Sequence, residues 1–264
     1  MDVAELREKY DIINWLDYNP WIVQYSKYLP NVIAASVKIV DVYYQISNAR
    51  VSLDYMDVDN YGQLISKDDY LHTQFIKSKF LFDSLAYYNY SIDLSWQVLY
   101  FFFGDNDYGV LQDKKKYEQL SKECNESNLR LQLWFHKQHK LSKYVFEFFN
   151  DKQTKEIREE YNYLKHRGTF FIDGLGENDE YLPIGLDGSR LRMINRKEVN
   201  LTDWKEKLIG FDRMFHDYFN NLIRWIMPRD YTEKNMGLAE QIGLMYRLKA
   251  WEKEQELLSS RKNT

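Results

Sequence analysis

Glycine and proline are scarce in this chain, and their scarcity restricts the possible folds more than any other feature. The 264 residues contain 11 Gly and 4 Pro. The long intervals between them carry apolar residues at three- and four-residue spacing, which is typical of helices. We therefore expect an all-α protein, built as a multi-helix bundle. A chain of this length buries about three quarters of its unfolded surface, so a core is available for its 22 Tyr, 15 Phe and 7 Trp.

Capping residues and helix breakers divide the chain into predicted helices. We expect helices at about 3–18, 31–53, 67–103, 151–167, 202–227 and 232–258, and one helix or a pair at about 113–150 with a break near Cys124. Ser66, Lys67, Asp68 and Asp69 supply the cap and acidic first turn of the third helix, and Thr202 begins the helix at 202.

Between residues 169 and 200 the helical pattern is replaced by Gly- and Pro-containing segments. Two short alternating runs flank Asp187 and Gly188, a pair of residues that favours a β-hairpin. We expect a small hairpin at about residues 180–197, inserted into one helical domain that covers 1–264, because the candidate linkers are short.

Charge and cysteine content limit the function classes. The net charge is −4 with pI ≈ 5.8, so an RNA contact has to depend on a local cluster of cations. The single Cys124 excludes an internal disulfide and a Cys-rich metal site, and is typical of a reducing cytoplasm. The sequence shows no signal peptide and no apolar run of membrane-spanning length, so we expect a cytoplasmic protein without membrane association.

The segment from Glu156 to Gly168, EIREEYNYLKHRG, is the strongest candidate site. On a helix, four of its polar residues fall within a sector of about 100°; they are Arg158, Asn162, Lys165 and His166. An apolar stripe formed by Ile157, Tyr161 and Leu164 lies beside that sector. His is the side chain that titrates nearest neutrality, and the last turn of a helix stabilises its cationic form. His166 beside fixed positive charge is therefore suited to proton transfer at a phosphate.

This block, Asn-x-x-Lys-His-Arg, resembles the HEPN superfamily of all-α proteins, whose signature is an Arg, usually followed by Asn, Asp or His, with a His four to six residues further on. Asn162 and His166 match the polar residue and the His, and Lys165 and Arg167 flank the His in the family's manner. Tyr161 occupies the place of the motif Arg. The nearest upstream arginine, Arg158, is separated from His166 by seven residues.

The resemblance implies a protein that acts on RNA, as a metal-independent endoribonuclease of a toxin, phage-defence or stress system. In that role His166 transfers a proton, Asn162 orients the substrate, and Arg158 with Lys165 or Arg167 stabilises the phosphate; no metal or cofactor is implied. It further implies a homodimer with the 156–168 helix at the interface, and an antitoxin or defence-system partner. The alternative is a catalytically inactive HEPN-like module that binds a nucleotide, RNA or a protein partner.

Other clusters leave alternatives open. Arg190 and Arg192 share one face of the second hairpin run and either bind phosphates or keep an exposed edge strand soluble. His136 and His139 have metal-ligand spacing but lack a matching carboxylate, and the Glu-x-x-Glu pairs lack the second acidic pair of a magnesium site. Asp212 and His216 are most simply a helical polar pair. Walker, dinucleotide-binding and nucleophile-elbow motifs are absent from the sequence.

Overall fold

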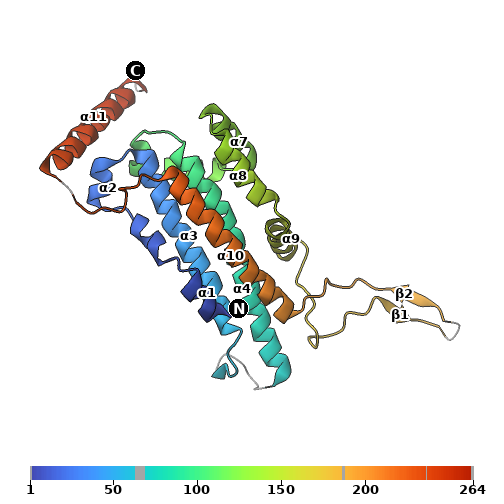
Figure 1. Cartoon of the computed structure of the whole chain (residues 1–264). Coiled ribbons are helices and arrows are strands. Elements are labelled where there is room, and N and C mark those ends of the chain that lie inside the picture. The colour runs from blue at the N-terminus through green and yellow to red at the C-terminus, as the bar shows by residue number, and fades with distance from the viewer. Residues whose placement is uncertain (1, 63–68, 186–187, 236, 263–264) are drawn as a thin grey trace. The chain divides into compact units, whose positions relative to one another are not determined.

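The computed structural model describes residues 2–62, 69–185, 188–235 and 237–262. These residues form helices and one two-stranded antiparallel sheet (Figure 1), which confirms the prediction of an all-α protein with a small hairpin. The helices are α1 (Val3–Lys9), the 3₁₀ helix η1 (Ile13–Tyr18), α2 (Ile22–Lys27), α3 (Pro30–Tyr55), α4 (Tyr70–Phe102), α5 (Gly109–Gln112), α6 (Lys114–Glu123), α7 (Glu126–Phe135), α8 (His139–Asn150), α9 (Lys152–His166), α10 (Leu201–Ile226) and α11 (Leu238–Lys262); the strands are β1 (Tyr181–Pro183) and β2 (Arg190–Arg192).

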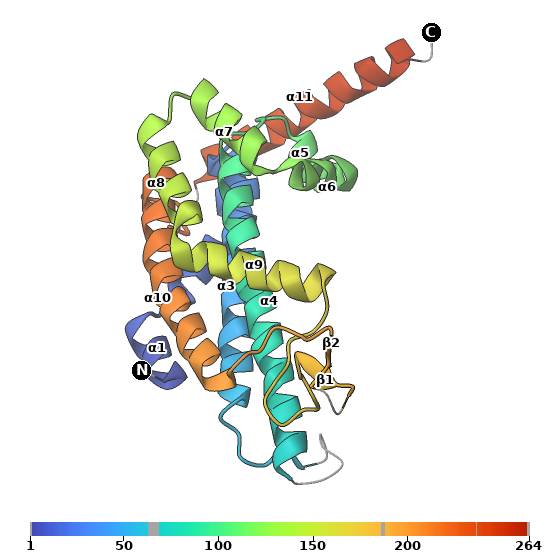
Figure 2. The same ribbon diagram turned by 90° about the vertical axis from the view of Figure 1, so that its right-hand side faces the viewer.

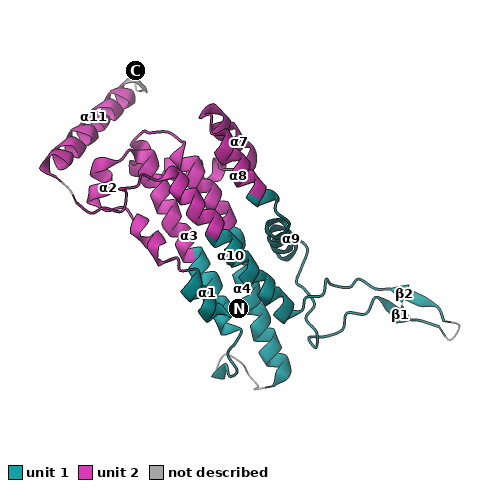
Figure 3. Ribbon diagram, viewed as in Figure 1, with its two compact units in different colours: residues 1–10, 45–90, 148–216 teal, residues 11–44, 91–147, 217–264 magenta. Residues whose placement is uncertain are grey.

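The chain divides into two compact units, shown in different colours in Figure 3. Unit 1 contains residues 1–10, 45–90 and 148–216, and unit 2 contains residues 11–44, 91–147 and 217–264. Helices α3, α4, α8 and α10 contribute residues to both units. The expectation of one domain over residues 1–264 stays a prediction.

Aromatic rings fill the core of unit 1. Phe211 lies edge-on to Tyr88, with ring centroids 5.4 Å apart, and near Phe148 and Phe215 at 6.3 and 5.9 Å. Helix α9 crosses the unit 1 part of α4 (Figure 2), where Tyr161 packs edge-on against Tyr90. These T-shaped pairs are a favoured ring geometry, so the aromatic composition serves packing here.

Unit 2 has its own aromatic core. The Trp15 ring lies 4.9 Å from Phe219, and its indole N–H donates to Asn220 Oδ1 at 2.8 Å. Tyr231 is fully buried and lies against Tyr18 and Tyr28, with ring centroids 5.7 and 4.9 Å away. Burial of a Trp and a Tyr requires a partner for each polar atom, and the Tyr231 hydroxyl finds one in Ser36.

The insertion after α9 is held at its base. The backbone N–H of Phe171 donates to Lys197 O and that of Val199 donates to Phe171 O, both at 2.9 Å. Phe170, Ile172 and Val199 are buried. At its far end, β1 and β2 pair with Tyr181 opposite Arg192 and Pro183 opposite Arg190, and the strand residues are exposed.

The hairpin therefore forms within the predicted range of 180–197. Gly188 adopts φ +85°, a backbone conformation for which glycine is favoured, whereas Asp187 lies outside the described residues. For the third predicted helix, Ser66, Lys67 and Asp68 also lie outside the described residues. Helix α4 begins at Tyr70, where Asp69 Oδ1 accepts the His72 N–H at 2.9 Å.

The prediction of one helix at 3–18 is wrong. Helix α1 ends at Lys9 and η1 begins at Ile13. The Asp11 carboxylate accepts the Ile13 N–H at 2.9 Å, and Asp side chains that bond nearby backbone groups compete with helical hydrogen bonds. The short helix α2 was not predicted.

The segment 113–150 forms three helices, because a second break follows the one predicted near Cys124. The second break follows Phe135, where Lys137 adopts φ 56°. The C-terminal helix begins at Leu238 and extends to Lys262, not over 232–258. Gln24 Nε2 donates to Tyr231 O and Glu233 O at 2.7 and 3.0 Å. These two backbone carbonyls therefore accept side-chain hydrogen bonds in place of the backbone hydrogen bonds that they would accept inside a helix.

Candidate functional site

Helix α9, which carries the predicted site, has a clear beginning and end. Asp151 caps it by accepting the N–H groups of Gln153 and Thr154 at 2.8 and 3.4 Å. It ends at His166, and Gly168 follows with φ +131°, a conformation that L side chains rarely adopt. Ser, Thr, Asp or Asn before a helix and Gly after it are the expected boundary residues, so local sequence sets both ends.

The apolar stripe of α9 faces the interior of unit 1 as predicted. Ile157 is buried, and Tyr161 and Leu164 are half-buried. The polar sector beside it faces solvent: Asn162, Lys165, His166 and Arg167 are exposed, and Arg158 is half-buried.

The structure brings three of the four predicted catalytic residues together. Asn162, Lys165 and His166 lie within the last turn and a half of α9. Arg158 is on the same side, but it lies eight residue steps before His166, which is about 12 Å along the axis at about 1.5 Å per step. His166 is therefore closer to Lys165 and Arg167 than to Arg158.

Tyr161, which stands in the place of the motif Arg, has a packing role. Its ring centroid lies 5.5 Å from that of Tyr90 with an interplanar angle of 79°, and the two hydroxyls are 3.2 Å apart. The motif position therefore supplies a contact between α9 and α4 and no cation.

Charges around α9 leave a positive excess at its C-terminal end. Glu156 accepts a hydrogen bond from Lys207 at 2.6 Å, and the buried Glu160 is paired with Lys197. Within the described part of the chain, Lys165 and Arg167 form no ion pair with a carboxylate. The carbonyl end of a helix stabilises cations such as Lys165 and Arg167. It is these two cations that suit the surface to an anion, although the whole chain has net charge −4.

The two hairpin arginines are apart from this cluster. Arg190 and Arg192 share a strand face with Tyr181 and Pro183, and Arg192 lies 3.9 Å from Glu180. Of the basic residues in the insertion, it is Lys197 at the base that contacts α9, through Glu160 and through the Tyr163 hydroxyl. The hairpin cations form a separate exposed group.

Sequence reasoning missed a buried charged network in unit 1. Arg50 Nε and one terminal nitrogen donate to the two oxygens of Asp212 at 2.9 and 2.7 Å, and the Tyr88 hydroxyl donates to Asp212 Oδ2 at 2.8 Å. Burial, and then the Asp212 charge, raises the pKa of Tyr88 far above its usual value. Arg50 also donates to Tyr10 O at 2.8 Å.

This network is structural, because solvent does not reach it: the Arg50 and Asp212 side chains are 3% and 0% exposed. The only signal in the sequence is an Arg within the apolar stripe of α3. The two carboxylate oxygens of Asp212 accept hydrogen bonds from Arg50 and Tyr88. Asp212 therefore has a role in the core beyond the helical pair with His216 that the sequence spacing suggested. The His216 ring instead lies edge-on to Tyr10, with centroids 5.2 Å apart.

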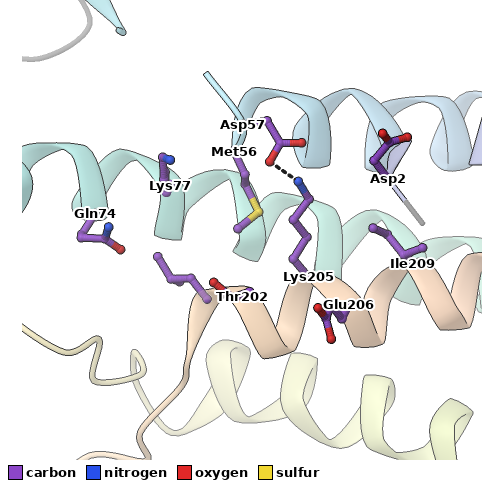
Figure 4. A pocket seen from close by; sticks show the side chains of 10 residues that line it. Asp2, Met56, Asp57, Gln74, Lys77, Thr202, Lys205, Glu206 and Ile209 are labelled. Carbon is purple, nitrogen blue, oxygen red and sulfur yellow. Dashed lines mark hydrogen bonds and ion pairs between the residues drawn. The ribbon is translucent and has the colours of Figure 1, made fainter. Parts of the chain in front are cut away.

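A cavity of about 370 Å³ in unit 1 lies beside the beginning of α10 (Figure 4). Lys205 reaches across it to pair with Asp57, and Met56 and Ile209 supply apolar walls. Asn200 Oδ1 accepts the N–H groups of Thr202 and Asp203 at 3.0 Å, so Asn200 caps α10, which begins at Leu201, one residue before the predicted start. The wall charges have both signs, and the cavity contains none of the predicted site residues.

Among the described residues, no group of three or more His, Cys, Asp or Glu side chains is arranged to hold a metal ion. No helix in the same part of the chain has the length and apolar character needed to cross a membrane. Comparisons with protein-family models, curated proteins and solved structures found no match.

Proposed function

We propose that this chain acts on RNA through the exposed C-terminal end of α9. The observation that carries the proposal is the solvent-facing cluster of Asn162, Lys165, His166 and Arg167, in which two cations have no carboxylate partner in the described residues. Lys and Arg bind phosphates by charge and hydrogen bonding, and His is a proton carrier near neutral pH. The HEPN resemblance of the same block supports an RNA substrate.

In the catalytic form of this proposal, the ribose 2′-hydroxyl attacks the adjacent phosphorus and the bond to the 5′-oxygen breaks. His166 accepts the 2′-hydroxyl proton while water protonates the leaving oxygen, or water accepts that proton while His166 protonates the leaving oxygen. The products are a cyclic phosphate and a 5′-hydroxyl. Lys165 and Arg167 stabilise the charge that develops on the phosphate oxygens. Asn162, one turn before His166, orients the substrate.

Arg158 requires a separate assignment because it lies about 12 Å from His166 along α9. Within one protomer it contacts a neighbouring phosphate of the same RNA strand. In a homodimer with α9 at the interface, α9 of a second copy brings another Arg158 toward His166. The dimer therefore offers a way to compensate for Tyr161 in the place of the motif Arg.

The test is incubation of the full chain with total RNA and a defined tRNA in EDTA, beside His166→Ala. His139→Ala is a matched control, because His139 is also an exposed His near a helix end. The proposal predicts cleavage by the wild type and the control, and loss of cleavage in His166→Ala with unchanged folded stability. Equal cleavage by all three proteins would contradict the role of His166.

The second candidate function is a module that binds RNA, a nucleotide or a protein without cleaving RNA. One observation favours it: Tyr161 packs on Tyr90 and leaves no Arg one turn from His166. This candidate predicts that RNA stays intact with every variant. Lys165→Ala and Arg167→Ala then weaken RNA binding and reduce its salt dependence, while His166→Ala has little effect.

A further inference from the structure

The outer face of α7, in unit 2, exposes three large apolar side chains. Leu131, Trp134 and Phe135 are 53%, 61% and 65% exposed. Their spacing places them on one side of the helix, while Leu129 and Leu133 on the other side are buried in unit 2. Clustered exposed apolar residues mark interaction sites more often than single ones do.

A groove of about 460 Å³ adjoins this face. Leu131 and Phe135 form one wall, and Tyr100 near the end of α4 and Phe103 just after it form another. At Gly104 a Cβ atom would lie 2.9 Å from Tyr100 O, so this wall excludes a side chain at position 104. The groove is open, and Asp105, Asn128, Gln132 and His136 line it beside these apolar side chains. The Asp105 carboxylate is paired with Lys116 at 3.3 Å, and the volume suits aliphatic or aromatic side chains.

Basic residues follow the C-terminal end of α7. His136, Lys137, His139 and Lys140 are all exposed. Among the described residues, Lys137 and Lys140 form no ion pair with a carboxylate. Lys137 also adopts φ 56°, where Gly or Asn is favoured, so a Lys here is not explained by the turn.

We infer that this face of α7 binds an acidic amphipathic helix of a protein partner. Aliphatic side chains of that helix enter the groove beside Leu131 and Phe135, and its carboxylates meet Lys137 and Lys140. Helices bind apolar grooves through anchors at i, i+3, i+4 and i+7, and complementary charge sets the choice of partner. This inference concerns unit 2 alone and does not depend on the RNA proposal.

Two other occupants fit the surface less well. In a symmetric contact between two copies of this face, the same cations would oppose one another. Single-stranded RNA stacks its bases on aromatic faces, but the Trp134 and Phe135 rings lie at 65° to each other with centroids 5.2 Å apart. They do not form a parallel stacking platform.

The experiment uses the full chain and two fluorescent synthetic helices with the same Leu anchors. One peptide carries Glu on its polar face, and the other carries Lys at the same positions. Fluorescence anisotropy should show binding of the Glu peptide about tenfold or more tighter than the Lys peptide. This difference should shrink in high salt, because exposed charges are screened.

Variants identify the binding face. Leu131→Ala and Phe135→Ala should each weaken binding of the Glu peptide about tenfold. Trp21→Ala is the matched control and should change nothing, since Trp21 is a 59% exposed aromatic residue elsewhere in unit 2. Lys137→Glu combined with Lys140→Glu should reverse the preference to the Lys peptide.

Five results would overturn the inference. Three of them are equal binding of both peptides, no binding of either peptide, and no effect of Leu131→Ala and Phe135→Ala. The fourth is a uridine oligomer that binds more tightly than the Glu peptide and no longer binds the Phe135→Ala variant, which would assign the face to RNA. Sedimentation of the same variants tests whether a second copy of this chain occupies the face. A wild-type dimer that Phe135→Ala dissociates would assign the face to a second copy and overturn the proposal equally.

Discussion

The buried ion pair of unit 1 gives a prediction whose magnitude follows from its burial. The Arg50 and Asp212 side chains are 3% and 0% exposed and share two hydrogen bonds. Arg50→Met removes the cation and leaves the Asp212 carboxylate buried with the Tyr88 hydroxyl as its remaining donor. Breaking a buried pair from one side costs about 3–5 kcal/mol of unfolding free energy.

The double variant Arg50→Met with Asp212→Leu separates the pair from its surroundings. Since the buried charge is then gone from both sides, its stability should lie within about 1–2 kcal/mol of the wild type. Lys114→Met is a surface control: the Lys114–Glu118 pair has side chains 88% and 51% exposed, and its loss should cost less than about 1 kcal/mol.

Urea unfolding followed by circular dichroism measures the unfolding free energy of all four proteins. The dependence of that free energy on urea concentration is compared among them, because a change in this slope indicates a changed denatured state. In thermal unfolding the single variant should lose about 6–20 °C, from about 2–4 °C per kcal/mol for a chain near this size. A single variant as stable as the wild type, or a double variant less stable than the single one, would refute the reasoning.

Three further predictions concern buried tyrosines, the lone cysteine and one turn. Burial raises the pKa of Tyr88, Tyr218 and Tyr231, so the folded chain keeps protons that the unfolded chain releases near pH 10. Stability should then be complete below about pH 10 and fall above it by up to about 1.4 kcal/mol per pH unit for each tyrosine, as urea midpoints across this range would show. Burial raises the pKa of the Cys124 thiol to about 12, so at pH 8 iodoacetamide should label the native protein about a thousandfold more slowly than the unfolded protein. Lys137→Gly should raise the unfolding free energy by about 1 kcal/mol, because Lys137 has φ 56°, and a lower urea midpoint would contradict this account of the turn.

Local signals predicted much of the secondary structure. Asp151 and Gly168 set the ends of α9, and both act at short range, through backbone groups of their own segment. The turn-forming residues ahead of Arg190 likewise predicted the hairpin. Local signals did not predict the end of α7, because Lys137 occupies a left-handed position where a Gly is usual.

Long-range contacts account for most of what the sequence did not predict. Gln24 is 207 positions from Tyr231, yet its side chain takes the Tyr231 carbonyl and delays the start of α11. Arg50 and Asp212 are 162 positions apart, and no helical period links them. Within α9, by contrast, the position of Arg158 relative to His166 followed directly from their spacing.

The most direct test of the central claim is the single-turnover rate of tRNA cleavage in EDTA, with the cyclic-phosphate ends of the products identified. A positioned acid or base contributes about a hundredfold to ten-thousandfold in rate, so His166→Ala should be slower than the wild type and than His139→Ala by at least about a hundredfold. If the wild type leaves tRNA intact, or if His166→Ala cleaves at the wild-type rate, the chain does not cleave RNA through α9.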